Sequence, residues 1–282
     1  MQTDLVQNIF GPVANSVLGK SFFIYDFSKG TALYGKAENI SRPLASLTKL
    51  MTIRVALSHT SPLEFYTVKS HDLDSDGFVG FVVGDSYRIS DLISGALIAS
   101  SNDSAVMLAH STRFSDESFI ETMNKTAEDL ALPSLHFGNP TGLDINDTIA
   151  TATGSARDIL SLLYFDYRDF TDLISVSTKI DSTIKSTNGR PIMLKNTNLA
   201  IDKLPLLLAS KTGYTDTAGG NLAILWREPS GETLGAAVLG STESGRFSDM
   251  QSIHDSTDTY INALQSLPVF CSKLNNLSVS NI

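Results

Sequence analysis

Ser46 and Lys49, in the segment Ser46-Leu47-Thr48-Lys49, are the residues of this sequence that point most directly to chemistry. Pro43 precedes them and suits a helix entrance, and residues 45–57 suit a largely buried helix. Side chains three positions apart share one face of a helix, so a hydroxyl and an amine would meet in its first turn, where backbone N–H groups lack helical partners. These are the components of an activated serine nucleophile.

This four-residue pattern is a weak signal by itself, because a surface serine and a solvated lysine would produce it as well. A second motif, Ser100-Ser101-Asn102, offers a hydroxyl and an amide at the expected junction of two helices. Ser101 or Asn102 can cap the second of these helices, which we expect over residues 103–110.

A third motif, Lys211-Thr212-Gly213, is followed by Tyr214 and lies on an expected late strand. Lys211 and Gly213 share one face of a strand, and the absence of a side chain at Gly213 would let a ligand approach the backbone. If this is an edge strand, the N–H of Tyr214 is open to a ligand.

The chain also contains a second copy of the first two patterns, in Ser182-Thr183-Ile184-Lys185 and Ser186-Thr187-Asn188. Both lie in one polar stretch that we expect to be a strand, where Ser182 and Lys185 would face opposite sides. The second copy therefore cannot form a serine–lysine pair.

The elements that must position the three motifs follow from the hydrophobic pattern. Strands open the chain, helices fill its middle, and antiparallel strands precede a closing helix. The expected fold class is α/β of the α+β kind: an antiparallel sheet flanked by helices, with a helical lobe inserted at about residues 70–165. We expect one domain over residues 1–267 and a tail over 268–282, without a second domain. The expected strands are 21–27, 31–34, 62–69, 177–184, 191–195, 206–215, 221–228 and 233–241, and the closing helix is 245–267.

Composition excludes several classes of protein. The 282 residues are 42% hydrophobic and 18% charged, with a net charge of −9 and no basic run, which argues against a nucleic-acid partner. Cys271 is the one cysteine, so an internal disulfide or a cysteine-based zinc site is excluded. No segment has the length of a membrane span, no membrane anchor is visible, and no signal segment is visible at the N-terminus.

The stretch from His71 to Gly77 contains Asp72, Asp74 and Asp76 and imitates the start of a calcium loop. The twelfth position of that loop requires a bidentate Glu, but Val83 stands there. We interpret the stretch as an acidic surface turn and predict neither a metal ligand nor a cofactor.

The order S-x-x-K, S-x-N, K-T-G is typical of class A β-lactamases and penicillin-binding proteins. Over about residues 18–267 the chain resembles the D-alanyl-D-alanine carboxypeptidases, the low-molecular-mass penicillin-binding proteins of peptidase family S11. The resemblance implies the serine β-lactamase/DD-peptidase-like fold. It extends to Tyr34-Gly35-Lys36, Ala99-Ser100-Ser101-Asn102-Asp103, Phe137-Gly138-Asn139-Pro140-Thr141-Gly142-Leu143, Asn196-Thr197-Asn198, Lys211-Thr212-Gly213-Tyr214-Thr215 and Ala218-Gly219.

This resemblance implies that Ser46 is the acylated nucleophile and Lys49 its proton acceptor. Ser100 and Lys211 would relay the proton to the leaving D-alanine, and Asn102 would hold the peptide carbonyl and position Lys49. If the two lysines lie close together in a partly closed cleft, we expect each to lower the pKa of the other, so that a neutral lysine acts as base.

The resemblance also assigns the substrate contacts. The backbone N–H groups of Ser46 and Tyr214 would form the oxyanion hole, and Thr212 would contact the terminal carboxylate. Some family members carry an Arg for that carboxylate at the position of Thr197, and here Arg190 is a candidate substitute. Many members also have a second, all-β domain and an amphipathic anchor, both of which we expect to be absent.

Three functions are compatible with these motifs. The first is a DD-carboxypeptidase acting on peptidoglycan stem peptides that end in D-Ala-D-Ala, with β-lactams as covalent inhibitors and an extracytoplasmic location. The second is a β-lactamase. Class A enzymes deacylate with a Glu, but no Glu occurs from Leu130 to Arg227, where Asp144 and Asp147 are among the acidic residues. The third is a non-catalytic penicillin- or peptidoglycan-binding module.

Overall fold

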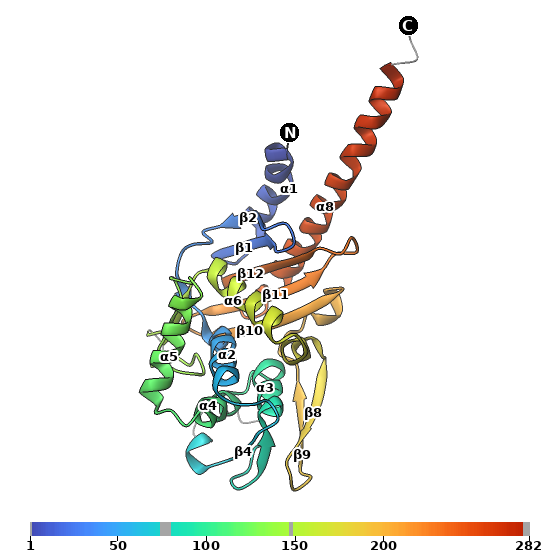
Figure 1. Cartoon of the computed structure of the whole chain (residues 1–282). Coiled ribbons are helices and arrows are strands. Elements are labelled where there is room, and N and C mark those ends of the chain that lie inside the picture. Colours follow the sequence, from blue (N-terminus) through green and yellow to red (C-terminus); the bar gives the residue numbers. More distant parts are fainter. Residues whose placement is uncertain (1, 74–79, 147–148, 279–282) are drawn as a thin grey trace.

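A computed structural model describes residues 2–73, 80–146 and 149–278, with side chains over 4–73, 80–146 and 149–266. These residues form a five-stranded antiparallel sheet in the order β10-β11-β12-β1-β2 (Figure 1). Strands from the first part and from the last part of the chain thus lie in one sheet, and β10 is an edge strand. The strands are β1 Ser21–Asp26, β2 Thr31–Lys36, β10 Leu207–Thr215, β11 Gly219–Arg227 and β12 Thr233–Ser241.

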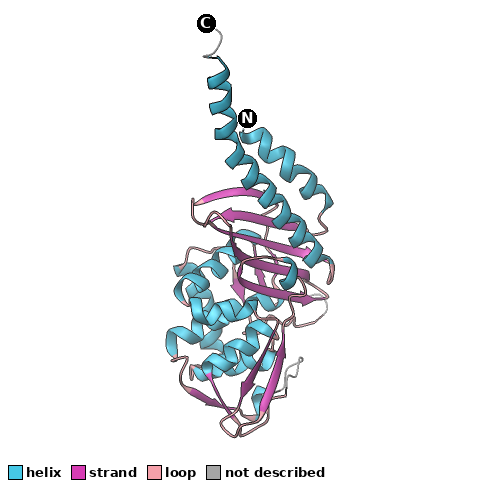
Figure 2. Cartoon of the chain, turned by 90° about the vertical axis from the view of Figure 1, so that its right-hand side faces the viewer, coloured by secondary structure: helices cyan, strands magenta, loops and turns pink. Residues whose placement is uncertain are grey.

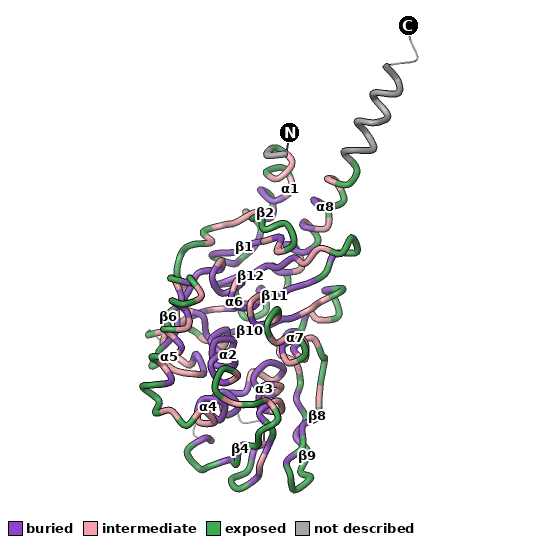
Figure 3. The backbone as a smooth tube through the Cα atoms, viewed as in Figure 1, coloured by how far each residue is buried: buried purple, intermediate pink, exposed green. Residues whose placement is uncertain are grey.

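Alternation along the central strands gives the sheet two apolar faces. On β1, Phe22 and Ile24 belong to one core cluster and Phe23 to the other. β11 repeats this pattern, with Leu222 and Ile224 on the first face and Ala223 on the second. Both faces are buried, as the tube in Figure 3 shows for β11 and β12, so the sheet requires a layer of helices on each side.

The first face is covered by α1 (Gln2–Ser16) and α8 (Gly245–Ser278), which lie side by side in Figure 2. Phe10 from α1 and Tyr260 from α8 contact each other there, with ring centroids 5.5 Å apart. Helix α1 was not predicted from the sequence, and the closing helix was predicted to end at Leu267, whereas α8 continues to Ser278. Across the described residues, the helices are too short or too polar to cross a membrane.

The second face is covered by α6 (Ala156–Asp169) and adjoins a group of helices that lies between β2 and β10 in sequence. This group contains more than the helical lobe expected at about residues 70–165, because η1 and α2 belong to it as well, and α2 is buried at its centre (Figure 3). Its helices are η1 Ala45–Thr48, α2 Lys49–His59, α3 Ile89–Ile98, α4 Asn102–Ser111 and α5 Asp116–Asp129.

Short strands and turns complete the lobe and connect it to the sheet. β8 and β9 form a hairpin that extends from the lower part of the molecule in Figure 1. The remaining elements are β3 Arg42–Pro43, β4 Phe65–Thr67, η2 Ser70–Asp72, β5 Ser86–Arg88, β6 His136–Phe137, β7 Ala152–Gly154, α7 Thr171–Ile174, η3 Ser175–Thr178, β8 Asp181–Lys185, β9 Pro191–Lys195 and η4 Ile201–Lys203.

The expected fold class is confirmed: an antiparallel sheet is flanked by helices, and a helical lobe is inserted between its strands. One predicted strand is wrong over its first half, because residues 175–178 form a 3₁₀ turn before β8 begins at Asp181. Ser177 is buried in that turn, where its hydroxyl accepts from the N–H of Ser210 at 3.0 Å. The division into one domain and a tail stays a prediction.

Candidate active site

Ser46 lies in the 3₁₀ turn η1, which leads directly into α2 at Lys49. In a 3₁₀ helix, side chains three positions apart are eclipsed, so the Ser46 hydroxyl and the Lys49 stem are aligned more closely than in an α-helix. Ala45, immediately before the serine, has a left-handed φ of 49°. A non-glycine residue in this conformation is strained, and such strain concentrates at functional sites.

Lys49 is completely buried, and its amine contacts three oxygens. Nζ lies 2.8 Å from Ser46 Oγ, 2.7 Å from Asn102 Oδ1 and 2.8 Å from the carbonyl oxygen of Thr141. Asn102 is the first residue of α4, whose N-cap is Ser101. The capping prediction is therefore confirmed for Ser101, and it is this cap that places the Asn102 side chain over the amine.

Burial lowers the pKa of Lys49 from its usual 10.5 to about 7. Its two non-serine partners are uncharged amide carbonyl groups, which satisfy the amine's N–H bonds without a negative charge that would retain the proton. Near neutral pH, a large fraction of this lysine is therefore a free amine.

Lys211 forms the second amine of the site. Its Nζ donates to Ser100 Oγ at 2.8 Å and to the carbonyl oxygen of Thr212 at 2.7 Å. Ser100 follows α3 and has a left-handed φ of 55°, which turns its side chain out of the helix path toward β10. The second and third motifs are thus joined by a direct hydrogen bond.

The pKa of Lys211 lies well below its usual value, first because the amine is buried and then because Lys49 and Arg246 are nearby positive charges. The expectation of mutual lowering therefore holds for Lys211, whereas burial is the cause of the shift at Lys49. Dehydration is the larger effect in both amines, so the closed environment matters more than their repulsion.

Gly213 has a structural role that the sequence analysis did not anticipate. A Cβ at this position would lie 2.8 Å from the carbonyl oxygen of Leu44 and 3.3 Å from the N–H nitrogen of Leu47. The glycine therefore lets β10 pack directly against the turn that carries Ser46. The sequence predicted that the missing side chain would let a ligand approach here, but the backbone of residues 44–47 fills this space. Asn221 on β11 reinforces the packing by donating to the carbonyl oxygens of Pro43 and Leu44.

The loop from Asn139 to Leu143 closes the other side of the Ser46 turn. Gly142 has a φ of +79°, and a Cβ there would lie 2.0 Å from the carbonyl oxygen of Ala45. Asn139 Oδ1 accepts from the N–H groups of Thr141 and Gly142, which orients the Thr141 carbonyl toward Lys49. The sequence signal for this function was the segment Phe137–Leu143, recognised only as part of the family resemblance.

The sequence of this chain matches a known family of proteins. The family Peptidase S11, described as D-alanyl-D-alanine carboxypeptidase, matches residues 9–242. The chain belongs to this family.

Individual relatives in the S11 family and related structures carry three different reaction names. D-alanyl-D-alanine carboxypeptidase DacF of Bacillus subtilis is 27% identical over 71% of this chain and 51% of its own length. D-alanyl-D-alanine endopeptidase of Haemophilus influenzae is 28% identical over 80% of this chain and 77% of its own length. The crystal structure of the Streptomyces K15 DD-transpeptidase, 24% identical, has a TM-score of 0.76 and covers 86% of this chain and 97% of its own.

The chain therefore spans about half the length of the first of these relatives. The structural likeness establishes the fold, which is that of the DD-peptidases, as predicted.

Within this S11 site, Thr197 and Thr212 lie side by side, with their hydroxyl oxygens 2.6 Å apart. The N–H of Thr197 also donates to the carbonyl oxygen of Ile98 at 3.1 Å, just before the Ser100 turn. Arg190 does not substitute for the family arginine, because it lies at the turn end of the β8–β9 hairpin and pairs with Asp85 at 3.2 Å. Thr197 lies beyond the opposite end of β9.

Arg246 is a buried cation of the site that the sequence analysis missed. Its Nη1 donates to the carbonyl oxygen of Gly213 at 2.8 Å, and its guanidinium lies 5.9 Å from the centroid of the Tyr214 ring. It comes from the first turn of α8, so no local spacing connects it to the three motifs. Burial lowers its pKa from the usual value.

The second copy of the motifs lies elsewhere, as predicted. Ser182 and Lys185 are on β8, three positions apart in a strand, and Lys185 is exposed. Ser186 Oγ accepts from the N–H of Arg190 within the hairpin turn. These residues stabilise a hairpin and do not approach one another as Ser46 and Lys49 do.

Of the two aspartates considered for deacylation, the structure describes Asp144 alone. Asp144 lines a cavity of about 290 Å³ together with Tyr214 and residues 215–217. Asp147 lies outside the described residues. No Glu is present between Leu130 and Arg227 in the sequence, so a carboxylate base of the class A kind has no candidate glutamate there.

The expected acidic surface turn is wrong at its first acidic residue, because Asp72 is completely buried. Asp72 Oδ2 accepts from the N–H of Lys69 at 2.6 Å, and Oδ1 accepts from the hydroxyl of Tyr66 at 3.1 Å. Asp74, Asp76 and Gly77 lie outside the described residues.

Proposed function

We propose that this chain is a serine DD-carboxypeptidase that removes the terminal D-alanine from peptidoglycan stem peptides through an acyl-enzyme at Ser46. The observation that carries the proposal is the position of a dehydrated amine, Lys49 Nζ, 2.8 Å from Ser46 Oγ. Such an amine at neutral pH is the general base that a serine nucleophile requires.

Hydrogen-bond valence supports this role for Lys49. A neutral amine has two N–H bonds and one lone pair. The oxygens of Asn102 and Thr141 are acceptors only, so they take the two N–H bonds. The lone pair then faces Ser46 and accepts its hydroxyl proton as Oγ attacks the carbonyl carbon of the substrate.

The negative charge that develops on the substrate oxygen requires donors in fixed positions. We assign these to the N–H groups of Ser46 and Tyr214. They belong to η1 and β10, which the absence of a Cβ at Gly213 brings into close contact. The donors would therefore be held in place before the substrate arrives.

Collapse of the tetrahedral intermediate breaks the peptide bond and releases D-alanine, whose nitrogen must gain a proton. The Lys211–Ser100 pair is suited to deliver it, because Ser100 Oγ accepts from Lys211 at 2.8 Å and can donate its own proton onward. The proton that Lys49 took from Ser46 then replaces the one given up by the Lys211–Ser100 pair, which leaves Lys49 neutral again. Water attacks the carbonyl carbon of the ester, Lys49 takes the proton of the water and passes it to Ser46 Oγ as the ester bond breaks, and the serine is restored.

Recognition of the terminal carboxylate is assigned to Thr212 and Thr197. Their hydroxyls share one hydrogen bond, so one O–H is free for the carboxylate, and rotation of the other hydroxyl would supply a second donor. The buried guanidinium of Arg246, which donates to the carbonyl oxygen of Gly213 on β10, adds a positive potential. A pair of neutral hydroxyls with this buried cation would thus replace the direct arginine contact.

β-Lactams would acylate the same serine, because their amide resembles the D-Ala-D-Ala peptide. The absence of a glutamate between Leu130 and Arg227 favours a long-lived penicilloyl-enzyme over a β-lactamase. Because such substrates lie outside the cytoplasmic membrane, we place the protein in an extracytoplasmic compartment.

The proposal is tested by labelling the purified chain with fluorescent penicillin and measuring D-alanine release from diacetyl-Lys-D-Ala-D-Ala. Wild type should be labelled and release D-alanine, and Ser46→Ala should do neither. Ser182→Ala, in the second copy of the motif, is the matched control and should behave as wild type. Labelling of Ser46→Ala contradicts the site assignment, and rapid nitrocefin turnover favours a β-lactamase. Labelling without D-alanine release favours a non-catalytic module or, where a cross-linked dimer is cleaved, an endopeptidase.

A further inference from the structure

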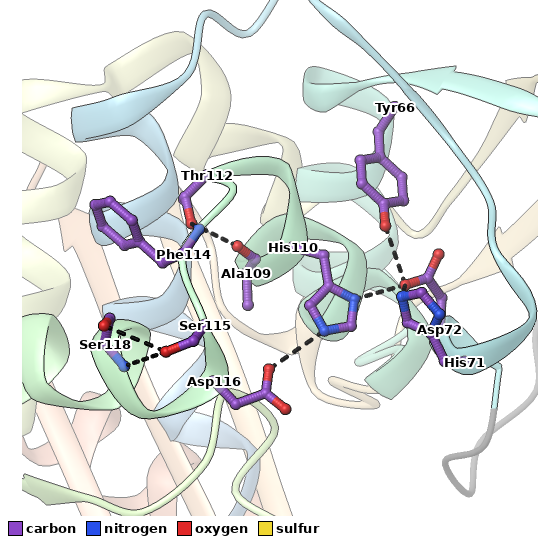
Figure 4. Close-up of polar contacts among 10 residues, drawn as sticks. All are labelled: Tyr66, His71, Asp72, Ala109, His110, Thr112, Phe114, Ser115, Asp116 and Ser118. Atoms are coloured by element: carbon purple, nitrogen blue, oxygen red, sulfur yellow. Dashed lines mark hydrogen bonds and ion pairs between the residues drawn. The ribbon is translucent and has the colours of Figure 1, made fainter.

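His71, Asp72 and His110 form a second polar cluster, separate from the catalytic lysines. Each offers one potential metal-ligand atom, and these atoms all lie within 4.8 Å of one another. Figure 4 shows both imidazoles next to the buried Asp72 carboxylate, and their ring centroids lie 5.0 Å apart. His71 and Asp72 come from η2 and His110 from the last turn of α4, so the fold brings together residues almost forty positions apart.

We propose that this cluster binds a divalent transition-metal ion of the Zn²⁺ class. Two imidazole nitrogens and one carboxylate oxygen are a donor set that suits Zn²⁺ and its first-row neighbours better than Ca²⁺, which prefers oxygen ligands throughout. Three protein ligands leave a fourth tetrahedral position for water.

The spacing requires only local adjustment. Ligand atoms about 2.0–2.2 Å from a tetrahedral ion lie about 3.3 Å apart. His71 Nε2 is 3.7 Å from Asp72 Oδ1, while His110 Nδ1 is 2.6 Å from the same oxygen. An ion would therefore enter by separating His110 from Asp72, replacing their hydrogen bond with two metal bonds.

The outer contacts of the cluster are those that metal ligands commonly have. His110 Nε2 lies 3.3 Å from Asp116 Oδ1, which would fix the tautomer that leaves Nδ1 free to bind the ion (Figure 4). On the other side, the Lys69 N–H and the Tyr66 hydroxyl hold the Asp72 carboxylate. A buried carboxylate would thus be oriented before any ion binds.

The cluster also has space and an entry route. His71 and Asp72 line a cavity of about 270 Å³, together with Val106 and residues of the Asn139–Leu143 loop. That volume has room for water ligands, and the His71 side chain is 57% exposed, so an ion can reach it from solvent. Thr141, whose carbonyl oxygen contacts Lys49, also lines this cavity.

The test uses the full chain without an affinity tag, stripped of metal by a chelator and titrated with ZnCl₂ by calorimetry. Wild type should bind about one Zn²⁺ and gain a higher melting temperature with added Zn²⁺. His71→Ala and His110→Ala should each weaken binding by about 100-fold or more, and Asp116→Asn by about 10-fold. His136→Ala, an exposed histidine on β6, is the control and should bind as wild type.

Cobalt absorption and the stability of the metal-free variant distinguish a lost metal site from a misfolded protein. Co²⁺ should give the intense visible absorption of a tetrahedral site in wild type and lose it in His71→Ala. The melting temperature of His71→Ala without metal should equal that of wild type, because the side chain is largely exposed. The proposal is overturned if wild type binds Zn²⁺ no more tightly than His71→Ala, or if binding is lost in Cys271→Ser and kept in His71→Ala.

Discussion

Helix α4 carries a polar cluster at each end, and the two differ in the charge of their partners. Its first residue, Asn102, contacts Lys49 with a neutral amide oxygen, and the pKa of Lys49 is lowered to about 7. Near its last residue, His110 lies between the carboxylates of Asp72 and Asp116, and its pKa is raised. Neutral acceptors can satisfy a buried amine without keeping its proton, whereas carboxylates keep the proton on the group they contact. The same helix therefore supports a base at one end and a charged or metal-binding group at the other.

Removing the amine is expected to have the largest effect. Lys49→Met keeps the stem but has no lone pair to accept the Ser46 proton, so acylation by penicillin should slow by about 10³–10⁴-fold. The rate is measured by stopped-flow or by timed labelling, with the folded state checked by thermal denaturation. Lys185→Met, on the exposed face of β8, is the matched control and should acylate at the wild-type rate. A Lys49→Met rate within tenfold of wild type would exclude Lys49 as the base.

Asn102→Asp would give the first cluster the charge pattern of the second. The new carboxylate, about 2.7 Å from Lys49 Nζ, should raise the pKa of the lysine by about 1–3 units. Acylation at pH 7 should fall by about 10- to 10³-fold, and the rate should recover at higher pH. Asn102→Ala removes the amide without adding charge, so its rate should fall without a shift of the pH profile to higher pH. Equal profiles for the two variants would contradict the electrostatic explanation.

The wild-type pH profile tests the same difference without mutation. Acylation requires neutral Lys49, so the rate should rise with pH and reach half of its plateau near pH 7. Below that pH it should fall about tenfold per unit, because each unit lowers the fraction of free amine tenfold. The acylation rate falls toward low pH because protonation of Lys49 stops the reaction. With its lowered pKa, Lys49 is protonated only as the pH falls through about 7. A rate independent of pH between 5 and 9 would contradict this expectation.

Gly142→Ala tests the loop between the two clusters. Its Cβ would collide with the carbonyl oxygen of Ala45 and would have to adopt a φ of +79°. We expect the free energy of unfolding, measured by urea denaturation, to fall by about 2–4 kcal/mol. Gly189→Ala is a close control, because its φ is +80° but a Cβ there meets nothing within 4 Å. Gly189→Ala should lower the free energy of unfolding by only about 1 kcal/mol, which is the cost of the left-handed conformation. An equal loss of stability in the two variants would show that packing at Gly142 is unimportant.

The smallest effect is expected from His71→Ala on acylation. The side chain is largely exposed and lies in the second cluster, so penicillin labelling in metal-free buffer should stay within about twofold of wild type. A large loss would show that the two ends of α4 are functionally coupled and that the clusters are not independent.

The sequence by itself determined the parts that depend on local order. The aromatic-rich segment 21–27 and the strand-like runs 221–228 and 233–241 marked β1, β11 and β12, and the cap at Ser101 marked the start of α4. The three motifs were found because their residue types and spacings are themselves the chemical requirement. α1 was missed because Gly11 and Pro12 interrupt its pattern, and its stability comes from packing against α8 and β2.

Only the tertiary structure decided how far the functional groups are dehydrated and which distant groups meet them. Thr141, Asn221 and Arg246 reach the site from a loop, a strand and a helix with no shared sequence spacing. Burial of Asp72 beside His110 likewise depends on η2 packing against the end of α4, and the sequence indicated only an acidic turn. Desolvation and long-range contact are properties of the packed chain, so a pattern of neighbouring residues predicts which groups are present and not the pKa or the partners that packing gives them.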